Sequence, residues 1–254
     1  ARYNPQVTLP NGFRMEWTGH LLELQARLRS RFMIRRAKVD VLKDLPEKVY
    51  ELAYIEPDGE IKKALRAERL LKFDPDTDLA GGDAKLMGQI ATVRKMMGMA
   101  KTPGVIAHLG RLLEDGDGKL VVFAYHTFVI NALVSAFPNS ACIQGSTPIA
   151  GREAAKVRFQ TDPDCRLFVG QLTAAGTGVD GLQNVCSHVV FAEASWTPGE
   201  NEQCVDRLHR IGQKSAVVAQ FLVAPDSLDE RILGSAIRKS VVTNKALDAP
   251  INLC

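Results

Sequence analysis

The sequence has few cysteines, and they form no recognisable pattern. Five cysteines are spread over 254 residues without a C-x-x-C pair, which argues against a zinc site and against a disulfide framework. No stretch approaches about 18 consecutive apolar residues, so no membrane span is expected. The first residues lack the basic-then-apolar order of a secretory signal and include no initiator methionine. These absences predict an intracellular piece of a longer protein, with reduced thiols and no membrane partner.

Two motifs that hold nucleotide phosphates are also missing. No G-x-x-x-x-G-K-[ST] loop occurs, because Gly118-Lys119 has no glycine five residues earlier and is followed by Leu120. No strand ends in Asp-Glu-x-His, since Asp229-Glu230 precedes Arg231 at the start of a predicted helix. Without these groups the chain has nothing to hold the β- and γ-phosphates or a magnesium ion. A G-x-G-x-x-G turn after the first strand is missing as well, which disfavours a dinucleotide-binding enzyme.

What the sequence does contain is ordinary for a globular protein. Hydrophobic residues make up 46% and charged residues 24%, so the chain is long and apolar enough to bury a core. The net charge of +3 permits a nucleic-acid partner but is equally common among unrelated enzymes. Function therefore has to be argued from motifs.

The pattern of apolar residues changes near residue 117. From about 15 to 115 it is mostly helical, with one strand expected at Val49–Ile55 and a helix at Ile61–Lys72. Further on, helical patterns near 127–136, 149–160 and 199–209 separate short apolar runs. These runs are Leu120–Ala124, Ala141–Ile143, Leu167–Val169, His188–Ala192 and Val217–Val223. The alternation predicts parallel strands with crossover helices, a doubly wound α/β domain.

A last helix is predicted to begin at Ser227, because Ser227 and Glu230 have the spacing of a capping box, and to run to about Ala246. Ligands of open parallel sheets bind beyond the carboxyl ends of the strands. The loops that follow Ala124, Gln144, Gly170 and Ala192 are therefore the places where a site is expected.

The loop after Gly170 is rich in glycine. Gly176, Gly178 and Gly181 lie within six positions, and glycines let a backbone approach a phosphate or a ribose closely. The side chain of Asp180 can accept hydrogen bonds from sugar hydroxyls. On its own, such a turn is structural about as often as it is functional.

The loop after Ala192 leads into a predicted helix that carries two arginines. Arg207 and Arg210 are three residues apart, so both guanidinium groups are expected on one helix face. Arginine is suited to bidentate contacts with phosphate in a transition state. From spacing alone, the alternative is a solvated face in which the arginines pair with Glu200, Glu202 and Asp206.

One long string of residues is specific enough to suggest a family. Gln203-x-x-Asp206-Arg207-x-His209-Arg210-Ile211-Gly212-Gln213 resembles motif VI of the Swi/Snf-type superfamily 2 ATPases. Leu172–Leu182 resembles the family's motif V, with Thr177 in place of the usual glycine and Asp180 where asparagine is common. Val121–His126 resembles motif IV.

Other segments extend the resemblance over nearly the whole chain. Gly145–Thr147, with Arg152 and Phe159-Gln160, is similar to the segment after motif IV, and Phe32–Pro46 is similar to the linker between the family's two lobes. Phe191–Glu193, followed by Trp196-x-Pro198-Gly199, resembles the annealing-helicase (HARP-like) branch and its bacterial and phage relatives. The likeness is weakest from about 56 to 85.

The resemblance implies a RecA-like second lobe of an ATP-dependent double-stranded DNA translocase, in a bacterial or phage-infected cytoplasm or in a nucleus. It divides the chain into an inter-lobe linker and helix, a mostly helical insertion, the RecA-like core and a C-terminal bracing helix. The expected bounds are 1–50, 51–116, 117–225 and 226–254. Such a lobe is a part of an ATP hydrolase and is expected to be inactive by itself.

The resemblance also implies how ATP would be used. ATP and Mg²⁺ would be held mainly by a first, N-terminal RecA-like lobe of the same protein. Arg207 and Arg210 would act as arginine fingers on the γ-phosphate, and Gln203 would help to sense it. Gly178 and Asp180 would lie near the ribose.

Double-stranded DNA is the other implied partner, held through its phosphates without sequence specificity. Ser146, Thr147 and Thr173 match family positions that touch the DNA backbone, and Arg152 and Trp196 are further candidates. Trp196 is equally consistent with packing against the motif VI helix.

For two histidines and one pair of arginines, a structural role is weighed beside a functional one. His126 is expected to be structural at the end of its strand rather than a contact, and His209 is expected to point away from the arginines and either to pack or to form a local hydrogen bond. Arg35-Arg36 either pairs with acidic residues of the first lobe or is a solvated face. For the whole chain, the alternative function is a stand-alone DNA-binding or regulatory module derived from such a lobe.

Overall fold

A six-stranded parallel sheet forms the centre of the molecule. The computed structural model describes residues 6–8, 14–16, 21–31, 42, 44–71, 84–175, 179–195 and 197–234. The strands are β3 (Lys48–Tyr54), β4 (Leu120–Ala124), β5 (Ala141–Ile143), β6 (Leu167–Gln171), β7 (His188–Phe191) and β8 (Val217–Val223). Their order is β3-β8-β7-β4-β6-β5, and every pair is parallel. The predicted doubly wound α/β fold is confirmed.

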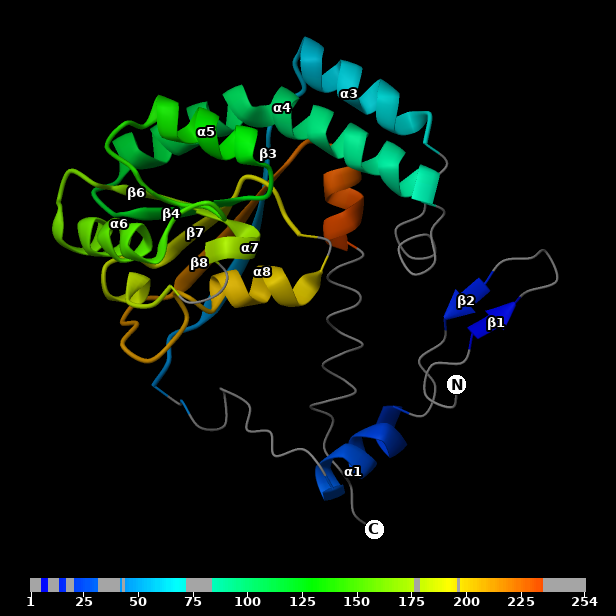
Figure 1. Cartoon of the computed structure of the whole chain (residues 1–254), viewed down its shortest axis with the longest axis horizontal. Helices are drawn as coiled ribbons and strands as arrows, with labels where there is room; N and C mark the ends of the chain where they lie inside the picture. Colours follow the sequence, from blue (N-terminus) through cyan, green and yellow to red (C-terminus); the bar gives the residue numbers. More distant parts are fainter. Residues whose placement is uncertain are drawn as a thin grey trace.

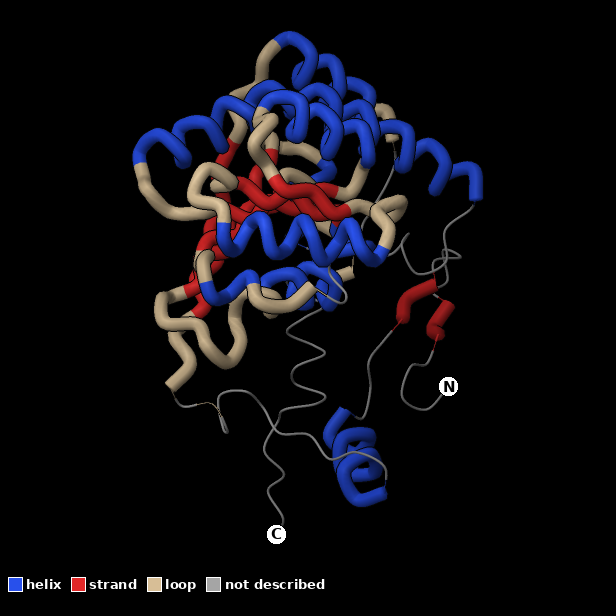
Figure 2. The backbone as a smooth tube through the Cα atoms, turned by 60° about the vertical axis from the view of Figure 1, so that its left-hand side comes forward, coloured by secondary structure: helices blue, strands red, loops and turns tan. Residues whose placement is uncertain are grey.

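Helices cover both faces of this sheet, as Figures 1 and 2 show. One layer contains α3 (Gly59–Arg69), α4 (Ala84–Asp115) and α5 (Thr127–Ala136). The opposite layer contains α6 (Ile149–Thr161), the short α7 (Leu172–Ala175), the 3₁₀ turn η1 (Leu182–Asn184) and α8 (Pro198–Val205). The remaining elements are the antiparallel pair β1 (Gln6–Thr8) and β2 (Arg14–Glu16), and α1 (Leu21–Arg31). Among the described residues, no helix is long and apolar enough to cross a membrane.

Alternate residues of each strand face opposite helical layers. In β4, Val121 and Phe123 join the core on the side of α6 and α8. Leu120, Val122 and Ala124 join the core on the side of α3, α4 and α5. Because both faces of β4 are buried, it has no polar alternation and reads as a continuous apolar run, whereas β3 is mostly exposed.

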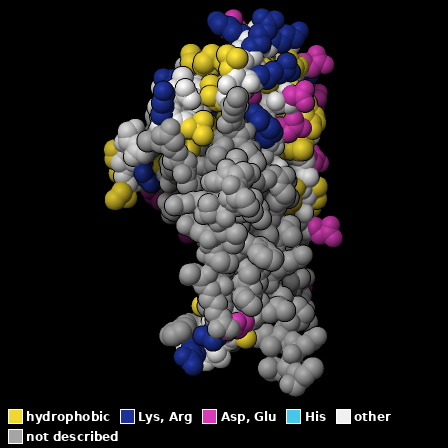
Figure 3. All heavy atoms as spheres, turned by 90° about the vertical axis from the view of Figure 1, so that its right-hand side faces the viewer, with side chains coloured by type: hydrophobic (Ala, Val, Ile, Leu, Met, Phe, Trp, Pro, Cys, Tyr) yellow, Lys and Arg dark blue, Asp and Glu magenta, His cyan; other side chains and the backbone are white. Residues whose placement is uncertain are grey.

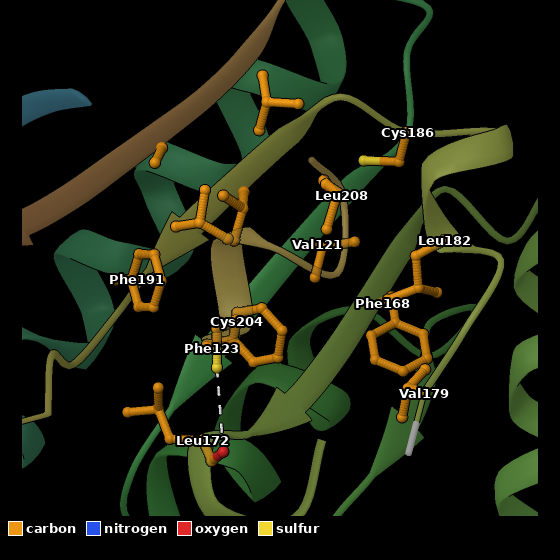
Figure 4. Packing of buried hydrophobic residues seen from close by; sticks show 14 of the residues in the cluster. Val121, Phe123, Phe168, Leu172, Val179, Leu182, Cys186, Phe191, Cys204 and Leu208 are labelled. Carbon is orange, nitrogen blue, oxygen red and sulfur yellow. Dashed lines mark hydrogen bonds between the residues drawn. The ribbon is translucent and has the colours of Figure 1, made fainter. Parts of the chain in front are cut away.

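Figure 4 shows the core on the α6 and α8 side. Leu172 of α7 and Cys204 of α8 meet there, and the Cys204 thiol donates to the Leu172 carbonyl oxygen at 3.9 Å. Burial raises the pKa of the Cys204 thiol to about 12, so this contact stays neutral. The core thereby fixes the start of α7 against the helix that leads to the arginines.

The strand β3 belongs to the central sheet. It pairs with β8 along its whole length, from Lys48↔Val217 to Tyr54↔Val223. The boundary that the sequence placed at residue 50 falls inside this strand. The helical segment after it also packs on the sheet, since Ile61 of α3 and Met97 of α4 join the same core as β4.

The predicted C-terminal helix begins where the sequence indicated. Residues 228–234 are helical, and the Glu230 backbone N–H donates to Ser227 Oγ at 3.3 Å. Leu228 and Ile232 pack on Ile90 of α4. The predicted extension to Ala246 lies outside the described residues.

A buried salt bridge and a buried hydrogen bond tie this helix to the body of the domain. Lys101 of α4 forms a buried salt bridge with Asp229, and Lys101 Nζ also donates to the Leu222 carbonyl oxygen at 3.1 Å. Glu68 of α3 accepts the Leu228 N–H at 2.6 Å. Burial alone would raise the pKa of Asp229, but the cations of Lys101 and Arg94 lower it below its ordinary value.

One predicted helix is shorter in the structure. The sequence indicated a helix over 199–209, whereas α8 ends at Val205 and turns follow up to Gly212. Gly212 has a φ of +100°, a left-handed conformation that a residue without a Cβ adopts at little cost. The two arginines therefore lie on turns after the helix, and the argument that they share one helix face is wrong.

Candidate functional site

Arg207 and Arg210 nevertheless converge on a single carboxylate. Arg207 Nη1 lies 3.4 Å from Asp180 Oδ1, and Arg210 Nη1 donates to the same oxygen. The side chain of Asp180 is 66% exposed, that of Arg210 is 39% exposed and that of Arg207 is 19% exposed. Two cations thus share one exposed anion, an arrangement in which another anion can take the place of the carboxylate.

The backbone beside Asp180 is anchored on both sides. Val179 and Leu182 are buried in the core shown in Figure 4. Gly181 has a φ of +91°, and a Cβ at that position would approach Gln160 Nε2 to 2.2 Å. The amide of Gln160 is the end of a flexible side chain, so the positive φ is what favours glycine at this turn. The predicted ribose contact Gly178 lies outside the described residues.

A hollow of about 610 Å³ opens beside these charges. It is lined by Asp180, Gln203, Arg207 and Arg210, together with Leu42, Gln183, Asp206 and Ile211. The structure therefore brings together four of the five residues that the sequence assigned to ATP. Two guanidinium groups and a carboxamide that line one hollow fit an anionic, hydrogen-bonding ligand such as a nucleotide phosphate.

Two acidic residues of α8 have other partners than the arginines. Glu200 accepts from Ser195 Oγ. Glu202 pairs with Lys48 at 2.9 Å and accepts from the Tyr50 hydroxyl. Burial would lower the pKa of Lys48, but Glu202 and Asp206 raise it, so this ammonium stays charged. Of the three acidic residues in the alternative of a solvated arginine face, Glu200 and Glu202 have these other partners, and Asp206 pairs with Lys48 at 3.1 Å.

His209 connects the arginine turns to the segment before β3. Its Nε2 lies 2.7 Å from the Pro46 carbonyl oxygen, and the residue is buried. The hydrogen bond of His209 is therefore not local, and it joins the turns after α8 to Pro46, in the segment predicted to be the inter-lobe linker. The predicted linker residues Arg35 and Arg36 lie outside the described residues.

Three of the five residues predicted to contact DNA lie beyond the carboxyl ends of β5 and β6. Ser146 and Thr173 are exposed, and Thr147 is half-buried. Thr147 Oγ1 accepts the Gln144 N–H at 3.0 Å, which closes the loop after β5. Trp196 lies outside the described residues.

Arg152 joins these two loops. Its Nε donates to the Thr147 carbonyl oxygen at 2.9 Å, and its Nη1 donates to the Ala174 carbonyl oxygen at 3.3 Å. Arg152, which was predicted to contact a DNA phosphate, therefore also holds the loop after β5 against α7, at a residue next to Thr173.

Two polar residues to which the sequence assigned no role of their own complete the loop edge. Gln171 at the end of β6 accepts the Gly145 N–H at 2.7 Å and donates to the Tyr125 carbonyl oxygen at 3.3 Å. Glu193 after β7 accepts the Tyr125 and His126 N–H groups at 2.9 and 2.8 Å. A polar residue directly after a buried apolar strand was the available signal for both.

His126 has the structural role expected of it. Its Nδ1 lies 2.6 Å from Glu193 Oε1, and its ring stacks on Phe128 with centroids 5.2 Å apart. It thereby holds the start of α5 against the loop after β7. Within the described part of the chain, no group of three or more His, Cys, Asp or Glu side chains could hold a metal ion.

Comparison with known proteins shows which family this chain resembles. A model of the helicase conserved C-terminal domain matches residues 104–212. DNA annealing helicase and endonuclease ZRANB3 of Bos taurus is 33% identical over 250 residues, which are 93% of this chain and 23% of that protein. The SWI/SNF-related matrix-associated actin-dependent regulator of chromatin subfamily A-like protein 1 homolog of Caenorhabditis elegans is 35% identical over 215 residues, 82% of this chain and 30% of that protein.

The chain belongs to the Swi/Snf family. It carries the family's helicase C-terminal domain, and it spans less than a third of each of these two relatives. The C-terminal part of the Fun30 ATPase domain has the same fold, with a TM-score of 0.58 and 18% identity over 76% of this chain and 90% of that chain. The Swi/Snf resemblance of the motifs is confirmed, including the annealing-helicase relatives that Phe191–Gly199 indicated.

Proposed function

We propose that this chain is the second ATPase lobe of an ATP-dependent translocase on double-stranded DNA, and that it needs a first lobe to hydrolyse ATP. The observation that carries the proposal is the convergence of Arg207 and Arg210 on the exposed carboxylate of Asp180 beside a hollow. The motifs that hold phosphates and Mg²⁺ are missing from the sequence. In this proposal they belong to the first lobe of the same protein.

Arg207 and Arg210 would exchange Asp180 for the γ-phosphate when the two lobes close over ATP. An ion pair as exposed as theirs contributes little stability, so a multiply charged phosphate can replace the carboxylate. Arginines inserted in this way stabilise the charge of the transition state, an effect of roughly three to five orders of magnitude in rate. Gln203 lines the same hollow and would sense the phosphate, while Asp180 and Gly178 would meet the ribose.

DNA would lie across the loops after β5 and β6. Ser146 and Thr173 are exposed there, and hydroxyl groups donate well to phosphate oxygens. Arg152 would act chiefly by holding Thr147 and Ala174 in place, since it donates to both backbones. The roles of Trp196 in DNA binding and of Mg²⁺ in hydrolysis stay predictions from the family.

The test is ATP hydrolysis by the chain alone and by the full-length protein, each with and without duplex DNA. Hydrolysis only by the full-length protein, accelerated by DNA, is the expected result. If neither hydrolyses ATP while the chain binds DNA, the alternative function as a binding or regulatory module replaces this one. If the chain hydrolyses ATP alone, the need for a first lobe is wrong.

A single substitution tests the DNA path separately. Thr173→Ala should raise the duplex concentration needed for half-maximal stimulation of hydrolysis at fixed salt. Thr92→Ala is the matched control, because Thr92 is an exposed residue of α4 whose hydroxyl donates to the Gly88 carbonyl oxygen at 2.9 Å. Equal stimulation of the two variants would remove Thr173 from the DNA path.

A further inference from the structure

Tyr125 is a large aromatic residue that remains exposed at the carboxyl end of the sheet. It follows β4 directly and is 40% exposed, although β4 itself is wholly buried. Its hydroxyl forms no hydrogen bond within the part of the chain that the structure describes. An isolated exposed tyrosine needs no explanation, so the argument depends on how this one is held.

Three polar side chains fix the position of Tyr125. Glu193, which is 3% exposed, accepts its backbone N–H, and Gln171 donates to its carbonyl oxygen. Arg94 of α4, which is 8% exposed, lies over its ring at 5.4 Å from the centroid. Arg94 is held in turn by the Ala194 carbonyl oxygen at 2.7 Å.

Burying Glu193 and Arg94 beside this tyrosine carries a cost. Burial lowers the pKa of the Arg94 guanidinium, and a buried charge is tolerated only when hydrogen bonds and counter-charges meet it. Here Glu193 bonds to the backbone of Tyr125, while Arg94 lies over the Tyr125 ring and bonds to Ala194 in the loop after β7. The arrangement presents an aromatic phenol in one fixed direction, which a solvated loop residue would not require.

The neighbours of Tyr125 are the loops proposed to touch DNA. In the sheet, β4 lies next to β6, and β6 lies next to β5. Gln171 contacts Tyr125 on one side and Gly145 on the other, and Gly145 directly precedes Ser146. The tyrosine therefore extends the row formed by Ser146 and Thr173 toward β7.

We propose that Tyr125 is a DNA-binding residue whose hydroxyl donates to a backbone phosphate, with Glu193, Gln171 and Arg94 as the residues that position it. The inference rests on the proposed function, because it takes the ligand to be duplex DNA. A phenol donates a hydrogen bond to a phosphate oxygen without carrying a charge. It therefore adds affinity without adding to the number of counterions released on binding.

The salt dependence of duplex binding separates this role from others. A random-sequence duplex of about 30 base pairs would be titrated with the full-length protein and with Tyr125→Phe over a range of salt concentrations. The variant should bind about ten- to a hundredfold more weakly, the effect of one lost hydrogen bond to a charged group. The slope of log K against log salt should stay the same, because no cation is removed.

The matched control is Tyr54→Phe, at another exposed tyrosine, whose hydroxyl donates to Glu230 at 3.0 Å. Equal affinity of the two variants would overturn the proposal. So would a smaller salt slope for Tyr125→Phe, because that would mean a displaced cationic contact. Absence of duplex binding by the unmodified protein would refute the proposed function itself. That result differs from equal binding by the two variants, which would refute only the role of Tyr125.

A second pair of variants tests the positioning role of Glu193 without replacing any polar side chain. A Cβ at Gly98 of α4 would approach Glu193 Oε1 to 2.5 Å, whereas a Cβ at Gly110 of the same helix meets nothing within 4 Å. Both changes to alanine raise helix propensity equally. Gly98→Ala should weaken duplex binding and Gly110→Ala should not, and equal binding by the two would remove Glu193 from the positioning role.

Discussion

The two halves of the candidate site are built in opposite ways. At the arginine half, one exposed carboxylate, Asp180, is shared by two cations that also reach solvent. At the loop half, the Glu193 side chain is 4% exposed and accepts three hydrogen bonds from the loop after β4. An exposed pair of charges is exchanged easily, while a buried and fully bonded carboxylate holds its partners in place. This contrast suits a site where a phosphate enters at one half and a polymer is held at the other.

The largest expected effect is at the exchangeable half. Arg210→Ala in the full-length protein should lower DNA-stimulated hydrolysis by about three orders of magnitude or more, with ATP binding mostly intact, because the contact matters chiefly in the transition state. The measurement is kcat beside the Kd for ATP. Arg66→Ala, at an exposed arginine of α3, is the control. Equal losses of binding and turnover would contradict the finger role.

The fixed half should respond in stability instead. Glu193→Ala leaves the N–H groups of Tyr125 and His126 without their acceptor, and each such loss costs about 1–3 kcal/mol. Asp180→Ala removes only an exposed carboxylate, so it should change the free energy of unfolding by less than about 0.5 kcal/mol. Urea unfolding of both variants checks this difference. Similar values for the two would mean that the halves do not differ as described.

Glu68 is a third carboxylate, and it is buried as Glu193 is but is not fully hydrogen-bonded. Glu68 is 2% exposed and has one oxygen, Oε1, without a hydrogen-bond partner among the described residues. Burial raises its pKa to about 7. Between pH 4.5 and 7 the folded protein therefore keeps a proton that the unfolded chain has lost, so stability should fall as pH rises through this window and level off above it.

The shift in the pKa of Glu68 sets the size of this decline in the free energy of unfolding, which is up to about 3 kcal/mol. Glu68→Gln imitates the protonated acid and should remove most of the decline in stability between pH 5 and 8. The free energy of unfolding as a function of pH measures it for both proteins. A variant that loses stability with pH as steeply as the parent would assign the decline to other groups.

The sequence predicted the sheet better than it predicted the site. Every apolar run from Leu120 to Val223 became a strand, because strands buried on both faces leave a continuous apolar signature. The pairing of β3 with β8 joins residues about 170 positions apart, and no local pattern encodes such a contact. For that reason the sequence placed the end of β3 in a separate helical unit.

At the site, motif spacing identified the arginines but not the way in which they meet. The three-residue interval of Arg207 and Arg210 suggested a helix face, whereas turns after Val205 bring both to Asp180. The sequence assigned no role to Gln171 or Glu193, because what they do lies in contacts with loops that are distant in sequence. A residue's chemistry is readable from its type, but its partners depend on the register of the whole sheet.

The smallest expected effect tests whether Asp180 competes with phosphate. Asparagine is common at this position in motif V, the family motif that Leu172–Leu182 resembles. Asp180→Asn should therefore keep a ribose contact while removing the negative charge that the two arginines hold. Because an exposed ion pair contributes at most about 1 kcal/mol, the variant should bind ATP up to about fivefold more tightly. The Kd for ATP and its dependence on ionic strength measure this. The gain should shrink at high salt, where the Asp180 pair is already screened. Weaker binding by the asparagine variant would instead mean that the carboxylate preorganises the arginines, and the halves of the site would then differ in exposure but not in purpose.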